Sequence, residues 1–331
     1  MLCILGVFII IGTCYSSPVD SPISSRAQLF FLMMTYSNVS NIEIWSHFFS
    51  NIPKSKYKFF VHSKLHSEFV PPSADYGFDV TLIPEYPNRY FTLHAPMAGL
   101  LDAALAESKS PYDQFIFLSA ENIPVKPFYD IYHNLCAVKA MSSLCVCPSN
   151  QWLVQDSSNI LYAMKGHQWI ILSKSDAIKS VKVYKAHPTW ESLFLKVPHC
   201  SEEYFFLAAI FGFYNKTEAA YNNFEHPYEL EQSVCRTYVW WPDYPVNSQF
   251  LTVAPPLSEK NTRGNQRIYS MPLEFLANMR QSQFFFVRKV NSADTKVIRS
   301  NGTEISLLAA IKETRLYSHR ERFAFGQPTF A

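Results

Sequence analysis

The stretch Gln28–Tyr36, QLFFLMMTY, is apolar at nearly every position over the length of one β-strand. A strand that is buried on one face alternates apolar and polar residues. A strand that is covered on both faces is apolar throughout, as in parallel sheets with a layer of helices on each side. This stretch therefore predicts a strand buried on both faces of an α/β sheet.

The segments that follow alternate between helix and strand patterns. Residues Asn41–Ile52 have helical spacing, with Ile44, Phe48 and Ile52 on one stripe, and His94–Ser108 is rich in alanine and leucine. Further strands are expected at 57–62, 78–83, 113–119 and 167–173, with a helix at 174–184. This order predicts an α/β domain with a mostly parallel mixed sheet flanked by helices.

No stretch with the composition of a linker divides residues 27–331, so we expect one domain there. Past Trp240 the pattern becomes irregular and rich in proline, with Pro242, Pro245, Pro255 and Pro256. We expect this part of the chain to be a long loop that wraps the sheet.

The amino-terminal residues 1–17, MLCILGVFIIIGTCYSS, are mostly apolar and end in small residues. The run is short for a membrane span, which needs about 20 residues. It is interpreted as a cleaved signal peptide or a short signal-anchor. Sequons at Asn38, Asn215 and Asn301 fit entry into the secretory pathway and predict a glycoprotein.

Composition excludes several classes of protein. Hydrophobic residues make up 48% of the 331 residues and charged residues 17%, which indicates a globular chain. A net charge of +2 argues against a nucleic-acid binder. There is no GxGxxG, no P-loop and no Asp-x-Asp motif. If the protein binds a diphosphate, fixed cations must therefore replace the metal ion.

Five cysteines follow the leader, so at least one is free or paired between chains. They are Cys136, Cys145, Cys147, Cys200 and Cys235. Cys145 and Cys147 are too close for an easy mutual disulfide. No pair of CxxC motifs supports structural zinc. His62 and His66 are four residues apart, but the strand pattern ends at His62, so a helical metal site is not expected.

Two adjacent carboxylates open an apolar run in Pro198–Ile210, PHCSEEYFFLAAI. Ser201 can cap the start of a helix, whose first turn favours acidic residues. Successive helical residues point about 100° apart, so Glu202 and Glu203 cannot share one environment. One carboxylate can stabilise the helix start while the other faces a cleft, where a carboxylate can act as a general base.

Six segments, in this order, resemble the core-2/I-branching β-1,6-N-acetylglucosaminyltransferase family and its plant relatives. The resemblance covers about residues 28 to 290. The segments are KYKFFVHSK, YDQFIFLSAENIPVKPFYDIYHNL, MKGHQWIILSKSDA, CSEEYFFLAAI, TYVWWPD and QFFFVRKV. Three features depart from the family pattern: Glu202 stands where aspartate is usual, the glycine-rich tract that follows the VWW segment in plant relatives is absent, and little stem separates the leader from the domain.

The resemblance implies a GT-A-type enzyme that transfers a sugar from a UDP-sugar to an acceptor hydroxyl with inversion, without a metal ion or other cofactor. The second acidic residue of the helix-start motif is the implied general base, which is Glu203 here. Lys289 matches the lysine that contacts the diphosphate. Arg267 is the better match to its arginine partner, with Arg263 as an alternative.

The resemblance also suggests further binding residues. Val61 and His62 would lie near the uridine of the donor, and Trp241 and Lys165 would line the acceptor side. Glu121 follows a strand at the ligand-binding edge of the sheet and is also a candidate for the acceptor side. Each has a plain structural alternative, since Trp241 could be a core aromatic, and Lys165 and Glu121 could be solvated charges.

The function expected from these features is a lumenal inverting glycosyltransferase, with N-acetylglucosamine as the expected sugar and a glycan or glycoprotein as acceptor. The Golgi lumen or membrane is the expected location, with secretion as an alternative. A xylosyltransferase-like enzyme is the nearest competitor. A non-catalytic glycan-binding protein on the same scaffold would not need Lys289 and Arg267 facing Glu203. A structural protein without a ligand would leave these three residues scattered.

Overall fold

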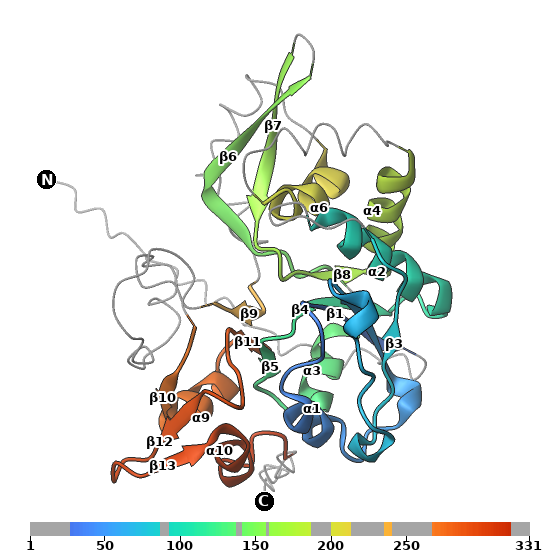
Figure 1. Cartoon of the computed structure of the whole chain (residues 1–331). Coiled ribbons are helices and arrows are strands. Elements are labelled where there is room, and N and C mark those ends of the chain that lie inside the picture. The colour runs from blue at the N-terminus through green and yellow to red at the C-terminus, as the bar shows by residue number, and fades with distance from the viewer. Residues whose placement is uncertain are drawn as a thin grey trace, which may run out of the picture.

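In a computed structural model of the chain, the residues described are 27–86, 93–136, 141–156, 159–186, 200–212, 235–239 and 267–318 (Figure 1). The predicted leader, residues 1–17, lies outside these ranges. Within them, no helix combines the length and the apolar character that crossing a membrane requires. The proposal of one domain over residues 27–331 stays a prediction.

The main sheet has five strands in the order β3-β2-β1-β4-β8. The first four run parallel to one another, and β8 pairs antiparallel with β4. The predicted fold class, an α/β architecture with a mostly parallel mixed sheet flanked by helices, is thereby confirmed. The strands are β1 (Leu29–Thr35), β2 (Tyr57–Ser63), β3 (Thr81–Leu82), β4 (Gln114–Ser119) and β8 (Ile171–Ser173).

Strand β1 explains why its sequence is apolar throughout. Successive side chains of a strand point to opposite faces, so Phe30 and Leu32 enter one core while Phe31 and Met33 enter another. All four are fully buried. The first core is covered by α2 (His94–Glu107), α4 (Lys174–Ala186) and α6 (Glu202–Phe211), and the second by α1 (Ile42–Phe49) and α3 (Phe128–Leu135).

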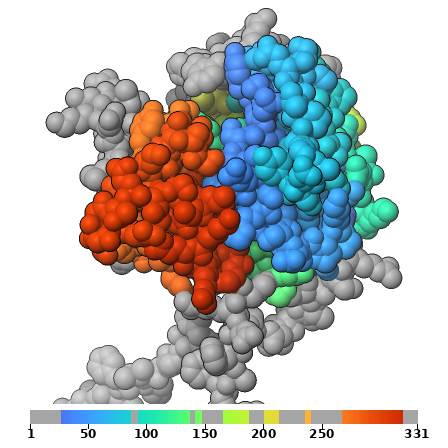
Figure 2. All heavy atoms as spheres, turned by 60° about the horizontal axis from the view of Figure 1, so that its bottom comes forward, coloured from blue at the N-terminus to red at the C-terminus, as the bar shows by residue number. Residues whose placement is uncertain are grey.

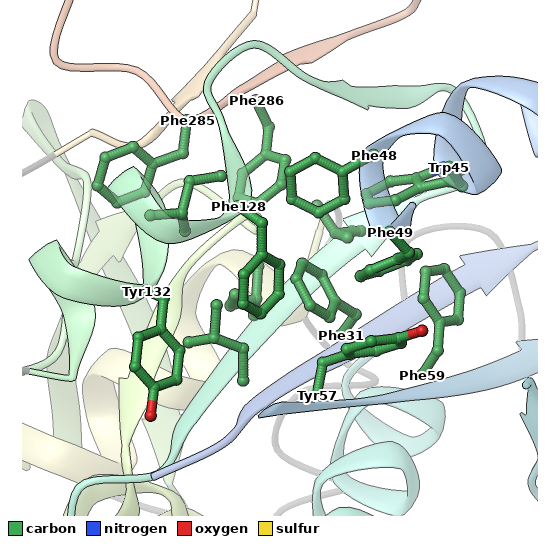
Figure 3. Packing of buried hydrophobic residues seen from close by; sticks show 14 of the residues in the cluster. Phe31, Trp45, Phe48, Phe49, Tyr57, Phe59, Phe128, Tyr132, Phe285 and Phe286 are labelled. Atoms are coloured by element: carbon green, nitrogen blue, oxygen red, sulfur yellow. The ribbon is translucent and has the colours of Figure 1, made fainter. Parts of the chain in front are cut away.

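The core beneath α1 is built mainly from aromatic rings (Figure 3). Phe49 stacks on Tyr57 with ring centroids 4.1 Å apart, and Phe31 meets Phe49 edge-on at 5.3 Å. Trp45 lies fully buried among the same rings. Truncating one such aromatic side chain to alanine costs about 3–5 kcal/mol of stability. This packing fixes α1, and with it the residue that precedes α1, against the sheet.

A second sheet, in the order β5-β11-β9, extends the carboxyl edge of the main sheet. Strand β11 runs antiparallel to β5 and parallel to β9. Its strands are β5 (Asn122–Pro124), β11 (Phe286–Arg288) and β9 (Thr237–Tyr238). Strand β5 follows β4 after a turn of two residues, so it lies at the edge of the main sheet. Because β11 pairs with β5, residues from late in the chain are brought to the same edge.

The prediction of an irregular loop past Trp240 is wrong for residues 267–318. These residues form a third sheet, in the order β10-β12-β13, with helices α9 and α10, over a third buried core that also takes in Ile44, Ile123, Val125 and Tyr238. The space-filling view shows them packed beside the amino-terminal segment (Figure 2). The elements are β10 (Ser270–Pro272), α9 (Leu273–Gln281), β12 (Lys296–Ile298), β13 (Glu304–Ser306) and α10 (Leu307–Glu313). Strands of three residues are too short to show a period in the sequence.

A long hairpin, β6 (Val146–Asp156) and β7 (Asn159–Gly166), was also not predicted. In Figure 1 it extends past α6, away from the main sheet.

A disulfide joins Cys145 to Cys235, 90 residues later in the chain. Within the described ranges Cys136 and Cys200 are free thiols. The described residues also include three short 3₁₀ turns: η1 (Lys54–Lys56), η2 (His66–Glu68) and η3 (Ala74–Tyr76).

Candidate active site

The carboxyl ends of β1, β2 and β4 lie side by side at one edge of the main sheet. Met34 of β1 is opposite His62 of β2 and Ser119 of β4. After Ser119 the chain turns tightly, because the N–H and the O–H of Ser119 both donate to Oδ1 of Asn122, at 2.8 and 2.6 Å. The turn places Glu121 at the edge where open α/β sheets bind their ligands.

Glu121, Arg267 and Lys289 come together at this edge from three distant parts of the chain. Arg267 forms an ion pair with Glu121. The backbone N–H of Val290 donates to the carbonyl of Glu121 at 3.0 Å, and that of Ile268 donates to the carbonyl of Lys289 at 2.9 Å. Arg267 and Lys289, the two cations predicted to contact the diphosphate, are therefore neighbours.

Lys289 occupies a strained and electrostatically crowded position. Its φ of 64° lies in the left-handed region, which residues other than glycine seldom adopt and which often marks functional sites. Burial lowers the pKa of Lys289, and the charges of Arg288 and Arg267 lower it further, while Glu121 opposes them. An anion bound beside Lys289 would relieve this crowding of positive charge.

Glu203 lies in the first turn of α6 and faces the end of β7. Its Oε2 is 3.2 Å from Nζ of Lys165, and 22% of the Glu203 side chain is exposed. The ion pair joins two regular elements, a strand end and a helix start, so the direction of the carboxylate is set by their packing.

Gly166 allows β7 to approach α6 closely enough for this contact. A Cβ on Gly166 would lie 2.6 Å from Cδ1 of Leu207 and 3.0 Å from the carbonyl oxygen of Cys145. Both distances are shorter than normal contacts, so only glycine fits without movement of the neighbours. Lys165 directly precedes Gly166, so the close approach of β7 to α6 at Gly166 also brings the Lys165 amine to Glu203.

The environment of Glu203 suits a proton acceptor. Burial raises the pKa of Glu203, and the positive charges of Lys165 and Arg288 act in the opposite direction. A carboxylate whose pKa is raised toward the working pH accepts a proton more readily than a fully solvated one.

Arg288 connects the two groups of residues and was not singled out in the sequence. Its guanidinium lies 4.6 Å from the centre of the Trp169 ring. Its charge acts on the pKa of both Glu203 and Lys289. The adjacent Arg-Lys pair after an apolar strand was the signal that could have identified it. We call Arg267, Arg288 and Lys289 the cation cluster.

Glu202 has a different environment from Glu203, as the helical geometry predicted. It is 5% exposed, and its Oε2 accepts a hydrogen bond from the N–H of Leu93, at the start of α2, at 3.1 Å. Ser201 stands at the N-cap position of α6, but its side chain makes no capping bond and instead contacts Nδ1 of His94 at 2.6 Å. The expected role of Ser201 as a side-chain cap is therefore wrong.

Potential metal ligands are not grouped in the described ranges: no set of three or more His, Cys, Asp or Glu side chains there could hold a metal ion. His62 lies in β2 and His66 in η2, so the two do not share a helix, as expected. Metal independence of the protein stays a prediction.

Comparison with known proteins identifies the family. A family model described as core-2/I-branching enzyme matches residues 29–280, most of the chain. The chain belongs to the core-2/I-branching enzyme family. It is therefore a glycosyltransferase of the core-2/I-branching type, a class that uses a sugar donor and a glycan acceptor. A search of curated proteins returned no match to the chain.

The matched range of this branching enzyme includes Glu121, Lys165, Glu203 and Arg267 but ends before Lys289. The structure supplies the connection, because Lys289 is tied to the matched part through the backbone hydrogen bonds at Glu121 and Ile268. Glu121, Arg267 and Lys289 thus lie together at the carboxyl edge, and the charge of Arg288 reaches Glu203 from there.

Two further predicted binding residues of the branching enzyme, Val61 and His62, are buried. Val61 is fully buried in the aromatic core, and His62 is 2% exposed, with its Nε2 accepting from the N–H of Tyr86 at 3.3 Å. Burial lowers the pKa of His62. Their contact with the donor stays a prediction. Trp241 lies outside the described residues.

Two of the three predicted glycosylation sites are described. Asn38 and Asn301 are exposed. Oδ1 of Asn38 accepts from the N–H of Val70 at 2.8 Å, and Oδ1 of Asn301 accepts from the N–H of Thr303 at 3.0 Å, in the turn between β12 and β13. Their modification stays a prediction, and Asn215 lies outside the described residues.

Proposed function

We propose that this branching enzyme transfers N-acetylglucosamine from its UDP-sugar to a hydroxyl group of a glycan or glycoprotein, with inversion at the anomeric carbon. The observation that carries the proposal is that Arg267 and Lys289 meet at the carboxyl edge, while Arg288, next to Lys289 in sequence, is close enough for its charge to lower the pKa of Glu203. A general base and a set of cations are the two parts that an inverting displacement of a diphosphate needs.

Glu203 is the proposed general base. As the acceptor oxygen attacks the anomeric carbon, its proton passes to the carboxylate of Glu203. The bond between the anomeric carbon and the diphosphate oxygen breaks with its electron pair on the diphosphate. One displacement of this kind inverts the anomeric centre. The side chain is partly buried, which raises its pKa and favours proton uptake.

Lys289 and Arg267 are the proposed partners of the diphosphate, in place of a metal ion. The negative charge that develops on UDP as the bond breaks would be met by cations that are already in place. The diphosphate would also offset the mutual repulsion that lowers the pKa of Lys289. Arg267 is 40% exposed on its side chain, so part of its guanidinium can reach a ligand while it holds Glu121.

The acceptor is proposed to bind on the side of Glu203 that carries Lys165, with Trp241 providing a flat face for a sugar ring. Nζ of Lys165 lies 3.2 Å from Oε2 of Glu203. The acceptor hydroxyl must bind next to the base, so Lys165 is close enough to contact the acceptor. Glu121 was a candidate for the acceptor side. Its ion pair with Arg267 favours the donor side instead, where it would orient the guanidinium. Val61 and His62 remain the candidates for the uridine.

The Golgi lumen or membrane is the proposed location, with residues 1–17 as signal peptide or short anchor and secretion as an alternative. The two exposed sequons among the described residues fit a lumenal protein. This part of the proposal rests on the sequence features and on the family.

The variant Glu203→Gln tests the proposed base. We expect transfer to fall by a factor of about 100 to 10,000, because the amide cannot take up the proton. UDP binding should stay close to that of the wild type. Transfer is measured with UDP-N-acetylglucosamine and a panel of glycan acceptors, and with UDP-xylose as the alternative donor.

Glu202→Gln is the matched control, since it makes the same change one residue earlier. The amide oxygen can still accept the hydrogen bond from Leu93, so most of the transfer activity should remain. Full activity of Glu203→Gln, or equal loss in both variants, would contradict the assignment of the base.

A further inference from the structure

Asn41 occupies a buried position with an unusual backbone conformation. It is 4% exposed and has φ 57° and ψ 30°, in the left-handed region. It stands at the N-cap position of α1, where its carbonyl accepts from the N–H groups of Ile44 and Trp45, but its side chain makes no capping bond. Asparagine and glycine tolerate this conformation better than other residues do.

The side chain of Asn41 binds the two turns that carry the proposed diphosphate residues. Its Nδ2 donates to the carbonyl of Val290 at 2.9 Å and to that of Ala120 at 3.4 Å. Its Oδ1 accepts from the N–H of Ser292 at 2.6 Å. Ala120 comes directly before Glu121, and Val290 comes directly after Lys289. One amide thus joins segments that are 79, 249 and 251 residues from it in sequence.

We infer that Asn41 is a positioning residue for the donor: it sets the separation between Lys289 and the Glu121–Arg267 pair. This inference rests on the proposed function. The backbone bond between Val290 and Glu121 is the direct link between the two turns, and Asn41 holds both of its flanks. The aromatic core holds α1 in place, and Asn41 directly precedes α1. The hydrogen bonds of Asn41 therefore hold the turn of Lys289 in a fixed position relative to that core.

The chemistry of the side chain is specific to an amide. Two backbone carbonyls and one backbone N–H face it, so it must both donate and accept. Aspartate has nearly the same shape but cannot donate when ionised, and it would add a negative charge close to the cation cluster. Glycine keeps the left-handed backbone and removes all three side-chain hydrogen bonds.

The experiment compares Asn41→Gly with Asn51→Gly in the full chain. Asn51 is a matched control because it is also left-handed, with φ 64°, lies just past the other end of α1 and is exposed. The probes are UDP for binding by calorimetry, and donor and acceptor titrations for kinetics. We expect Asn41→Gly to weaken UDP binding and raise the KM of the donor on the order of 10- to 100-fold, because small misplacements of binding groups have effects of this size.

The split between kinetic constants separates positioning from a structural role. Positioning predicts a raised donor KM with the acceptor KM unchanged. A loss of folded protein would lower the apparent kcat and leave both KM values as they were, and that result would overturn the inference. Asn51→Gly should match the wild type in all three constants.

If Asn41→Gly folds poorly, its folded fraction is isolated by size-exclusion chromatography, and the same constants are measured on that fraction. A variant with no folded fraction would overturn the inference, because it would show that the amide supports the fold as a whole. Wild-type protein that fails to bind UDP would count against the proposed function. Wild-type binding together with unchanged binding in Asn41→Gly would count against this inference alone.

Discussion

The site contains two carboxylate–cation pairs that are built in different ways. Glu203 and Lys165 lie on a helix start and a strand end, and their contact is set by the close packing of β7 on α6 at Gly166. Glu121 and Arg267 lie in turns and beside short strands; backbone hydrogen bonds connect both to the turn of Lys289, and Asn41 bonds that turn to the turn of Glu121. The base can be fixed by regular structure alone, whereas the cations need a separate set of polar links.

The two regions also differ in what their charges favour. At Glu203, burial raises the pKa of the carboxyl group and the charges of Lys165 and Arg288 act against this rise, a balance that suits proton transfer. In the cation cluster, burial and neighbouring positive charges lower the pKa of Lys289. The first arrangement favours exchange of a proton, and the second favours binding of an anion.

Lys289→Met is expected to have the larger effect, and on the donor alone. Losing a charge-assisted hydrogen bond costs about 1.5–3 kcal/mol, which corresponds to roughly a 10- to 150-fold weaker affinity for UDP. Calorimetry with UDP measures this directly. Unchanged affinity for UDP would contradict the proposed difference between the two regions, since Lys289 would then have no part in binding the donor.

Lys165→Met is expected to have a smaller effect, which depends on pH. The positive charge of Lys165 lowers the pKa of Glu203, so its removal lets that pKa rise further. A base must be deprotonated to act, so the acidic limb of the kcat/KM profile should move to higher pH. Transfer at pH 5 should fall roughly two- to fivefold more than at pH 8, the range expected for a partly exposed ion pair.

Lys165→Arg keeps the charge and is the control for this profile. It should retain the acidic limb of the wild type. A Lys165→Met profile that falls evenly at every pH would mean that Lys165 acts on the acceptor only and not on the base. UDP affinity should stay unchanged in both variants, in contrast to Lys289→Met.

The main sheet could be predicted from the sequence because its strands are long apolar runs. The run at Gln28–Tyr36 became β1, and its neighbours were found within a few residues of their ends. The different environments of Glu202 and Glu203 were also predictable, because helical geometry requires that two adjacent carboxylates differ; the choice of Glu203 as the base came from the family resemblance and stays a prediction. The structure confirms this difference in the burial of Glu202 and in its bond to Leu93.

Other features depend on contacts between distant residues and leave little trace in the sequence. The strands within residues 267–318 are three residues long, too short to show a period, and the proline-rich stretch before them suggested a loop. The disulfide partner of Cys145 lies 90 residues away. Spacing alone cannot assign such a pair. Asn41 makes its side-chain contacts only with residues far along the chain, so no local pattern marks it.

The arrangement also bears on the alternatives to an enzyme. A structural protein without a ligand would leave Glu203, Arg267 and Lys289 scattered, but Arg267 and Lys289 are neighbours and Arg288 lies within electrostatic reach of both Lys289 and Glu203. A glycan-binding protein would not need Lys289 and Arg267 facing Glu203, and UDP binding tests this difference. The family match favours the transferase over both alternatives.

The role of the cation cluster is tested most directly by calorimetry of the wild-type protein with UDP, with EDTA present throughout. UDP is expected to bind, because Lys289 and Arg267 are proposed to take the place of a metal ion at the diphosphate. Binding that is absent in EDTA and restored by manganese would contradict the proposed role of the cations.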